Sequence, residues 1–237
     1  MDYAPIVSSL TPIAVPPPGK ALGCLPRESK IGQWCPMASE RIKIIPRAQW
    51  ADFAQDISLR PHVREVLDQD GVGSCAAEAT TGGVMIGRAF AGLPHVSLNP
   101  WSIYRVTSGG RDRGSAIDAN LEYAREHGIC PMDMHPRSLT WRAEPSEAAK
   151  EAAKQYRIVE FYDVTTIDEM VSCLLMGFPV VYGSSGHAVC KVAHLDDSRG
   201  LDLNSWGADW GDGGFGVWAS YRAVDFRYGA FAIRTVE

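Results

Sequence analysis

Residues 69–77 have the sequence Gln-Asp-Gly-Val-Gly-Ser-Cys-Ala-Ala, and this stretch governs how the rest of the chain is interpreted. Its glycines allow the backbone to come close to a bound molecule. The residues from Ser74 to about Ala91 have the pattern of a helix, whose N-terminus favours a thiolate at Cys75. Gln69 carries an amide that can donate to a developing oxyanion. The stretch therefore predicts a nucleophilic thiol at the start of a helix.

Two later segments supply partners for that thiol. Residues 186–189 are Gly-His-Ala-Val, and residues 204–211 are Asn-Ser-Trp-Gly-Ala-Asp-Trp-Gly. A neighbouring imidazolium lowers a thiol pKa from ~8.5 to roughly 3 to 4, so His187 is the expected partner and would later protonate the leaving amine. Asn204 would orient the ring without adding a second negative charge. Gln69 and the Cys75 backbone N–H would form the oxyanion hole, where one donor is worth ~3 kcal/mol of barrier.

Each of these residues also has an ordinary structural interpretation. A single cysteine at a helix start is usually packed or exposed without a catalytic role. A single histidine in a strand is more often a core or edge residue. The Asn-Ser-Trp-Gly segment is compatible with a turn followed by a core tryptophan. The joint occurrence of the three segments in this order favours catalysis.

Composition and charge exclude several function classes. The chain has 237 residues, 46% of them hydrophobic, which suits one domain of two lobes or two small domains. The net charge of -5 and the lack of a basic run argue against a nucleic-acid surface. The most apolar stretch, residues 170–182, is short and contains Gly177 and Pro179, so we expect no membrane span. Residues 1–18 lack the features of a signal peptide, which predicts a cytoplasmic or virion-associated protein.

The six cysteines are expected to be reduced in such a compartment. Cys24 and Cys35 flank a short loop and could pair in an oxidising setting. The histidines and cysteines do not follow metal-ligand spacing, and no phosphate-binding or dinucleotide motif occurs. We therefore expect neither a metal nor a cofactor.

The predicted class is α+β, with helices mainly in the first half and strands in the second. We divide the chain into a proline-rich arm, residues 1–45, and a domain, residues 46–237. Further helices are predicted from a capping-box pattern at residues 115–118, over residues 146–155, and from Thr166 to Gly177. The predicted strands lie at residues 180–182, 187–193, 201–204, 215–218 and 230–235.

Gly82 and Gly83 lie inside the helix that follows Cys75. A glycine in a helix interior costs ~1 kcal/mol relative to alanine. We therefore expect these glycines to permit close packing of the helix against another element.

The three segments resemble the active-site motifs of papain-like cysteine peptidases. Residues 98–100, 114–115 and 128–131 also resemble segments of that family, so the likeness extends from about residue 60 to 220. It implies a helical N-terminal lobe and an antiparallel β-barrel-like C-terminal lobe, with the active site in the cleft between them. It also implies Cys75 as nucleophile, His187 as base and acid, Asn204 as orienting residue and Gln69 as oxyanion donor. The substrate-binding residues that the likeness implies are Gly73, Ser74, Gly114, Ser115, Gly186 and Trp206, the last of these shielding the Asn204–His187 hydrogen bond.

The sequence departs from the family pattern at two positions near Cys75. Val72 replaces a cysteine that forms a disulfide in many members, and Ala76 replaces a tryptophan beside the nucleophile. We also expect no long inhibitory propeptide of the kind found in secreted members. Residues 1–45 are too short and too poor in helical pattern to be one, although they could still cover the cleft.

The leading hypothesis is a thiol endopeptidase that acts on a peptide or protein substrate, with no nucleic-acid or membrane partner. A second hypothesis is a structural component of a larger assembly, for example a viral or phage particle, docked through residues 1–45. A third is an acyl transferase, peptide ligase or cell-wall amidase with the same nucleophile. Such relatives more often orient the histidine with Asp or His, so Asn204 favours the peptidase.

Overall fold

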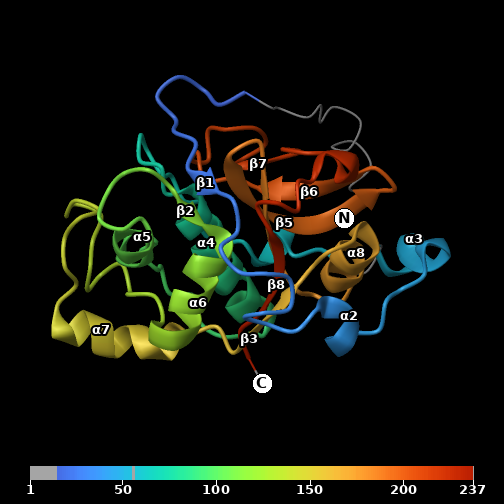
Figure 1. Ribbon diagram of the computed structural model, residues 1–237, viewed down its shortest axis with the longest axis horizontal. Helices are drawn as coiled ribbons and strands as arrows, with labels where there is room; N and C mark the ends of the chain where they lie inside the picture. Colours follow the sequence, from blue (N-terminus) through green and yellow to red (C-terminus); the bar gives the residue numbers. More distant parts are fainter. Residues whose placement is uncertain (1–14, 55–56, 237) are drawn as a thin grey trace.

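The computed structural model describes residues 15–54 and 57–236. Figure 1 shows helices α4 to α7 gathered on one side of the molecule and an antiparallel sheet with α2, α3 and α8 on the other. The predicted α+β class is confirmed. Within the described residues, no helix is both long and apolar enough to cross a membrane.

The helices follow the sequence pattern closely. The helix after residue 74 and those near residues 147 and 167 are where they were predicted, and Ser146 and Thr166 accept hydrogen bonds at the starts of the latter two. The α-helices are α2 (Ala38–Arg41), α3 (Trp50–Ala54), α4 (Cys75–Phe90), α5 (Trp101–Thr107), α6 (Ile117–His127), α7 (Glu147–Ala153) and α8 (Ile167–Leu175). Short 3-10 turns lie at Arg47–Gln49, Arg60–His62, Lys154–Tyr156 and Tyr221–Ala223.

The capping box predicted at residues 115–118 is wrong. Helix α6 is capped by Ala116, which makes no side-chain capping bond. Ser115 belongs to a strand instead. The Asp118 carboxylate accepts the backbone N–H groups of Glu28 and Ser29, at 2.9 and 2.6 Å between nitrogen and oxygen. The Asp118 carboxylate thus binds the backbone of the N-terminal arm instead of capping helix α6.

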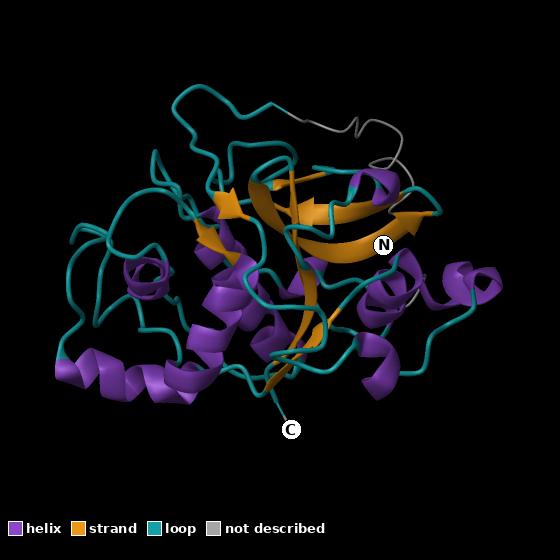
Figure 2. Cartoon of the chain, viewed as in Figure 1, coloured by secondary structure: helices purple, strands orange, loops and turns teal. Residues whose placement is uncertain are grey.

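Two sheets are present in the described residues (Figure 2). The smaller is a parallel pair of β1 (Cys24–Leu25) and β2 (Ser115–Ala116). The larger is antiparallel and contains, in spatial order, β3 (Glu160–Asp163), β8 (Ala230–Arg234), β4 (Val180–Ser184), β5 (His187–Asp196), β6 (Arg199–Leu203) and β7 (Phe215–Gly216). The sequence predicted the last five of these but not β1, β2 or β3.

Helix α4 packs directly against the larger sheet, and its glycines set the distance. A Cβ atom at Gly83 would lie 2.7 Å from Ile233 Cδ1 in β8, well inside van der Waals contact. A Cβ atom at Gly82 would lie 3.6 Å from Leu203 Cδ2 in β6, an ordinary contact. The expectation of close packing is therefore confirmed, most sharply at Gly83.

All six cysteines, each within the described residues, are buried free thiols. Cys24 and Cys35 are thus unpaired in this structure, as expected for reduced thiols.

Candidate active site

Cys75 is the first residue of α4, at the end of the helix where the backbone N–H groups are free of intrahelical partners. Its side chain is fully buried, at 0% exposure. Burial raises the pKa of the Cys75 thiol to about 11, although the backbone of Ala188, Gly23 and Ala76 counteracts part of that rise. The residue is therefore a neutral thiol at physiological pH in this structure.

The ring of His187 is held by Asn204. His187 begins β5 and Asn204 follows the last residue of β6, so the antiparallel pairing of these strands brings the two side chains together. His187 Nε2 lies 2.8 Å from Asn204 Oδ1. Because an amide oxygen only accepts, Nε2 carries the proton and Nδ1 keeps its lone pair. Nδ1 makes no hydrogen bond to any described residue. Burial lowers the pKa of His187 to about 4, with the Asn204 bond acting in the opposite sense.

Two tryptophans enclose the His187 ring. The Trp206 ring stacks on it with centroids 4.5 Å apart, and the Trp218 ring meets it edge-on at 4.9 Å. Trp206 was predicted to shield this region. Trp218 was predicted only as part of a strand, because no motif marks it and its contact with His187 joins distant segments. Both indoles are buried, so they enclose the His187 ring on two sides.

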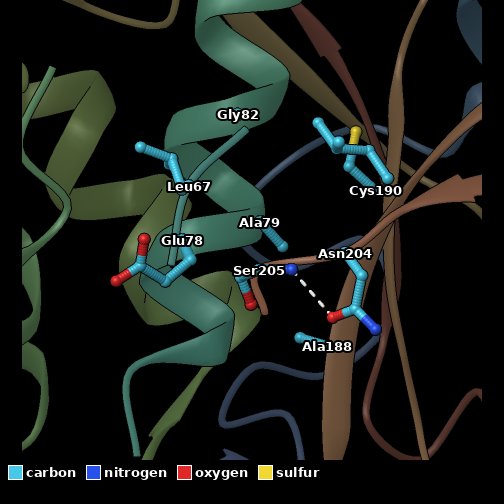
Figure 3. A pocket seen from close by; sticks show the side chains of 9 residues that line it. Leu67, Glu78, Ala79, Gly82, Ala188, Cys190, Asn204 and Ser205 are labelled. Carbon is cyan, nitrogen blue, oxygen red and sulfur yellow. Dashed lines mark hydrogen bonds between the residues drawn. The ribbon is translucent and has the colours of Figure 1, made fainter. Parts of the chain in front are cut away.

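Asn204 lies at a small pocket between α4 and the strands β5 and β6 (Figure 3). Its Oδ1 also accepts the backbone N–H of Ser205, at 2.7 Å. The Ser205 hydroxyl donates in turn to Gln69 Oε1, at 2.8 Å. The asparagine loop and the loop before α4 are thereby fastened to each other, which fixes the orientation of the Gln69 amide.

The Gln69 amide nitrogen faces the N-terminal arm. Its Nε2 donates to the carbonyl oxygen of Ala21 at 3.0 Å and to that of Val72 at 2.8 Å. A peptide carbonyl of the chain itself therefore lies on the side chain predicted to stabilise an oxyanion.

Residues 20–25, which we call the strap, run through this site. Figure 1 shows their strand β1 beside β2. The Ser115 N–H donates to Gly23 O and the Cys24 N–H donates to Gly186 O, both at 2.9 Å. Lys20 Nζ lies 2.5 and 2.7 Å from the two carboxylate oxygens of Asp68. The strap thus covers the site from Asp68 at one end to Ser115 at the other.

The fit of the strap depends on two glycines, Gly23 and Gly114. A Cβ atom at Gly23 would lie 2.0 Å from the Gly73 carbonyl oxygen, and one at Gly114 would lie 2.2 Å from the Gly23 carbonyl oxygen. No side chain is tolerated at such distances without movement of the backbone. The strap is therefore matched to this cleft, and residues 1–45 include a segment that covers it.

The predicted substrate-binding residues are placed in three ways. Gly73, Gly114, Ser115 and Gly186 contact the strap, and Trp206 covers His187. Ser74 points away, because its hydroxyl donates to Glu78 Oε1 at 3.0 Å.

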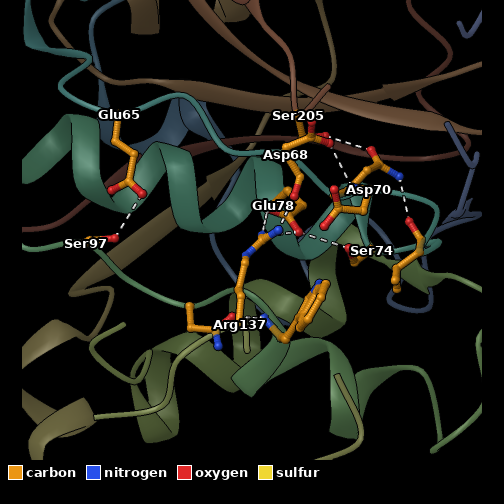
Figure 4. A network of polar contacts seen from close by, with 12 residues as sticks. Glu65, Asp68, Asp70, Ser74, Glu78, Ser97, Arg137 and Ser205 are labelled. Atoms are coloured by element: carbon orange, nitrogen blue, oxygen red, sulfur yellow. Dashed lines mark hydrogen bonds and ion pairs between the residues drawn. The ribbon is translucent and has the colours of Figure 1, made fainter. Parts of the chain in front are cut away.

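A buried ion pair that no sequence motif predicts supports the loop before Cys75 (Figure 4). Glu78 is 1% exposed, and Arg137 Nη2 donates to its Oε1 at 2.6 Å. Burial raises the pKa of Glu78, whereas Arg137 acts to lower it. Arg137 also donates to the backbone carbonyl of Asp68 and lies 4.8 Å from the centre of the Trp101 ring. This contact joins helix α4 to the residue directly before Gln69.

Known proteins resemble this chain in structure but not closely in sequence. No family model matches the chain, and no curated protein matches it. Among solved structures, the cysteine protease xylellain from Xylella fastidiosa superposes with a TM-score of 0.70 at 21% identity, covering 92% of this chain and 97% of that one. The fold is papain-like.

Two precursor structures share the papain-like fold. Digestive procathepsin L 3 of Tenebrio molitor has a TM-score of 0.65 at 17% identity and covers 91% of this chain and 76% of that one. Recombinant stem bromelain precursor has a TM-score of 0.66 at 17% identity, with 92 and 84% covered. The fold implied by the motifs is therefore confirmed.

Proposed function

We propose that this chain is a cysteine endopeptidase that hydrolyses peptide bonds with Cys75 as nucleophile and that the strap holds it closed. One observation carries the proposal: Gln69 already binds a peptide carbonyl, that of Ala21, and the backbone of Gly23 in the same segment contacts the Cys75 thiol. The solved structures that share the fold include cysteine proteases, among them precursor forms, which supports both parts of the proposal.

In the open cleft, His187 Nδ1 takes the proton of Cys75, because Nε2 is already occupied by its bond to Asn204. The thiolate sulfur then attacks the substrate carbonyl carbon. Gln69 Nε2 and the Cys75 backbone N–H receive the developing negative charge. His187 protonates the leaving amine, the C–N bond breaks and a thioester remains on Cys75. Water, deprotonated by His187, hydrolyses the thioester and restores the thiol.

Asn204 and Trp206 act on the ring rather than on the substrate. The Asn204 oxygen fixes the Nε2–H tautomer, which leaves Nδ1 as the base. Trp206 covers the His187–Asn204 bond, and exclusion of water strengthens it.

The strap has to leave before a substrate can enter, since it bonds to Gln69 and contacts Cys75, and both of these side chains are buried. Gly23 offers a way to displace it within the full-length chain. A valine there would place its Cβ 2.0 Å from the Gly73 carbonyl oxygen, which the closed state cannot accommodate.

The test compares hydrolysis of a quenched fluorescent peptide library by full-length wild-type, Gly23→Val and Gly23→Val/Cys75→Ala chains. We expect turnover in Gly23→Val well above that of wild type, and none in the double variant. Equal turnover with and without Cys75 would refute the mechanism. Absence of turnover in Gly23→Val, with native circular dichroism, would refute the peptidase assignment.

A further inference from the structure

We propose that Asp68 selects a basic side chain, lysine or arginine, in the residue directly after the scissile bond. This inference rests on the proposed function and adds a substrate class to it.

The strap shows what the site beside Gln69 accepts. Ala21 places its carbonyl on Gln69, and the adjacent residue, Lys20, places its ammonium between the two carboxylate oxygens of Asp68. The Lys20 side chain is 19% exposed and that of Asp68 is 38% exposed. A carboxylate beside the bound carbonyl thus already holds the lysine that precedes Ala21. A substrate whose leaving side reaches Asp68 therefore crosses the site in the opposite chain direction to the strap.

The position of His187 decides which side of the scissile bond Asp68 serves. The leaving amine has to lie beside the ring that protonates it. That ring stacks on Trp206, and Trp206 forms a β-bridge with Asp68. Asp68 therefore lies at the end of the cleft toward which the leaving side of a substrate extends. The opposite end is formed by Ser115, where β1 pairs with β2.

The Asp68 carboxylate is held in place by its surroundings. Its Oδ1 accepts the backbone N–H of Asp70 at 2.8 Å, and its own carbonyl accepts from Arg137 (Figure 4). The neighbouring Gly207 leaves room for the carboxylate, since a Cβ atom there would lie 2.7 Å from Asp68 Oδ2. A fixed carboxylate loses little entropy when it binds a cation, which favours selection over adventitious contact.

The strap and a basic substrate would compete for the same carboxylate. Removing the strap leaves Asp68 without its Lys20 partner, and among the described residues Lys20 is the cation that pairs with it. A lysine or arginine of a substrate restores that ion pair, whereas an apolar or acidic residue does not.

The experiment uses full-length Gly23→Val chain and two peptides that differ only after the scissile bond, lysine in one and its uncharged analogue norleucine in the other. We expect kcat/KM to be about tenfold higher for the lysine peptide, as a charge-assisted hydrogen bond implies. Asp68→Asn should reduce the lysine-to-norleucine ratio to about 1. The matched control is Asp70→Asn, because the Asp70 carboxylate is exposed and has no hydrogen-bond or ion-pair partner among the described residues. That control should keep the ratio.

A binding measurement separates this inference from the proposed function. Anisotropy titration of the same two peptides into Gly23→Val/Cys75→Ala, with and without Asp68→Asn, reports selection without turnover. A lysine preference that Asp68→Asn removes supports the inference, even if no variant hydrolyses either peptide and the peptidase assignment fails. Equal affinities for the two peptides, or a lysine preference that survives Asp68→Asn, would overturn the inference about Asp68. The peptidase assignment would still stand if the Gly23→Val chain hydrolysed both peptides.

Discussion

At the scale of single residues, the closed site holds a neutral thiol and a neutral imidazole. Burial raises the pKa of Cys75 to about 11 and lowers that of His187 to about 4, so thiol and imidazole coexist without charge at neutral pH. The thiolate–imidazolium pair expected from the sequence is thus a property predicted for the open cleft. Solvent entering the cleft removes the desolvation that shifts both groups.

The roles of His187 and Asn204 predict unequal losses in the open Gly23→Val background. His187→Ala should lower kcat by ~10³-fold, because proton transfer to and from the reacting atoms is lost. Asn204→Ala should lower it by ~10²-fold, because the ring loses its orientation but keeps its base. Steady-state kinetics on one peptide provide the comparison. A larger loss for Asn204→Ala than for His187→Ala would contradict the assigned roles.

The buried His187 also predicts an acid dependence of stability in the closed wild-type chain. Its pKa is about 4 when folded and ~6.5 when unfolded. The unfolded chain therefore binds more protons between these values, and the contribution to stability is complete above ~6.5 and decreases as the pH falls towards 4. The expected loss is about 3 kcal/mol.

Urea unfolding at several pH values measures this contribution. A His187→Gln variant retains the other titrating groups but lacks this one, so its free energy of unfolding should fall less steeply between pH 6.5 and 4. Parallel curves for the two proteins would show that His187 does not remain neutral in the fold.

At the scale of elements, local sequence predicted helix α4 and strands β4, β5, β6, β7 and β8 because each has its own periodicity or turn signals. It could not predict β1 and β2, which have two residues each and exist only through pairing across 91 positions of the chain, from Cys24 to Ser115. Cys75, His187, Asn204 and Gln69 could be named from the sequence, because each lies in a recognisable motif. Arg137, Trp218 and the strap could not be assigned, since their contacts join distant segments that no local pattern connects.

The two adjacent glycines of α4 predict opposite effects on stability. Gly83→Ala should destabilise the chain by about 1–3 kcal/mol, because its Cβ would meet Ile233 Cδ1 at 2.7 Å. Gly82→Ala meets an ordinary contact of 3.6 Å and should stabilise by up to ~1 kcal/mol through helix propensity. Chemical denaturation measures the free energy of unfolding of both variants. Equal changes in the two would contradict the packing of α4 on the sheet.

At the scale of the whole molecule, the sheet contains a fully buried ion pair. Lys191 Nζ lies 2.7 Å from Asp202 Oδ1, and both side chains are 0% exposed. The other oxygen, Oδ2, accepts from the Tyr182 hydroxyl at 3.1 Å and from the backbone N–H of Trp218 at 2.8 Å. The pair thus connects β4, β5 and β6 to the tryptophan that borders His187.

Removing only the cation should be more harmful than removing both charges. Lys191→Met leaves an uncompensated buried carboxylate and should cost about 3–5 kcal/mol. Lys191→Met/Asp202→Asn keeps hydrogen-bonding groups at position 202 without that charge and should recover part of the loss. Unfolding free energies give both values. A double variant less stable than Lys191→Met would contradict the view that the uncompensated charge dominates.

The central prediction is that one segment, the strap, determines whether Cys75 is a buried thiol or a reactive thiolate. The direct measurement is the pH dependence of iodoacetamide labelling at Cys75, located by peptide mapping, in full-length wild-type, Gly23→Val and Gly23→Val/His187→Ala chains. We predict slow labelling of wild type below pH ~10, fast labelling of Gly23→Val near pH 5, and loss of the fast reaction in the double variant. Labelling of wild type at pH 5 as fast as that of Gly23→Val, or fast labelling without His187, would contradict it.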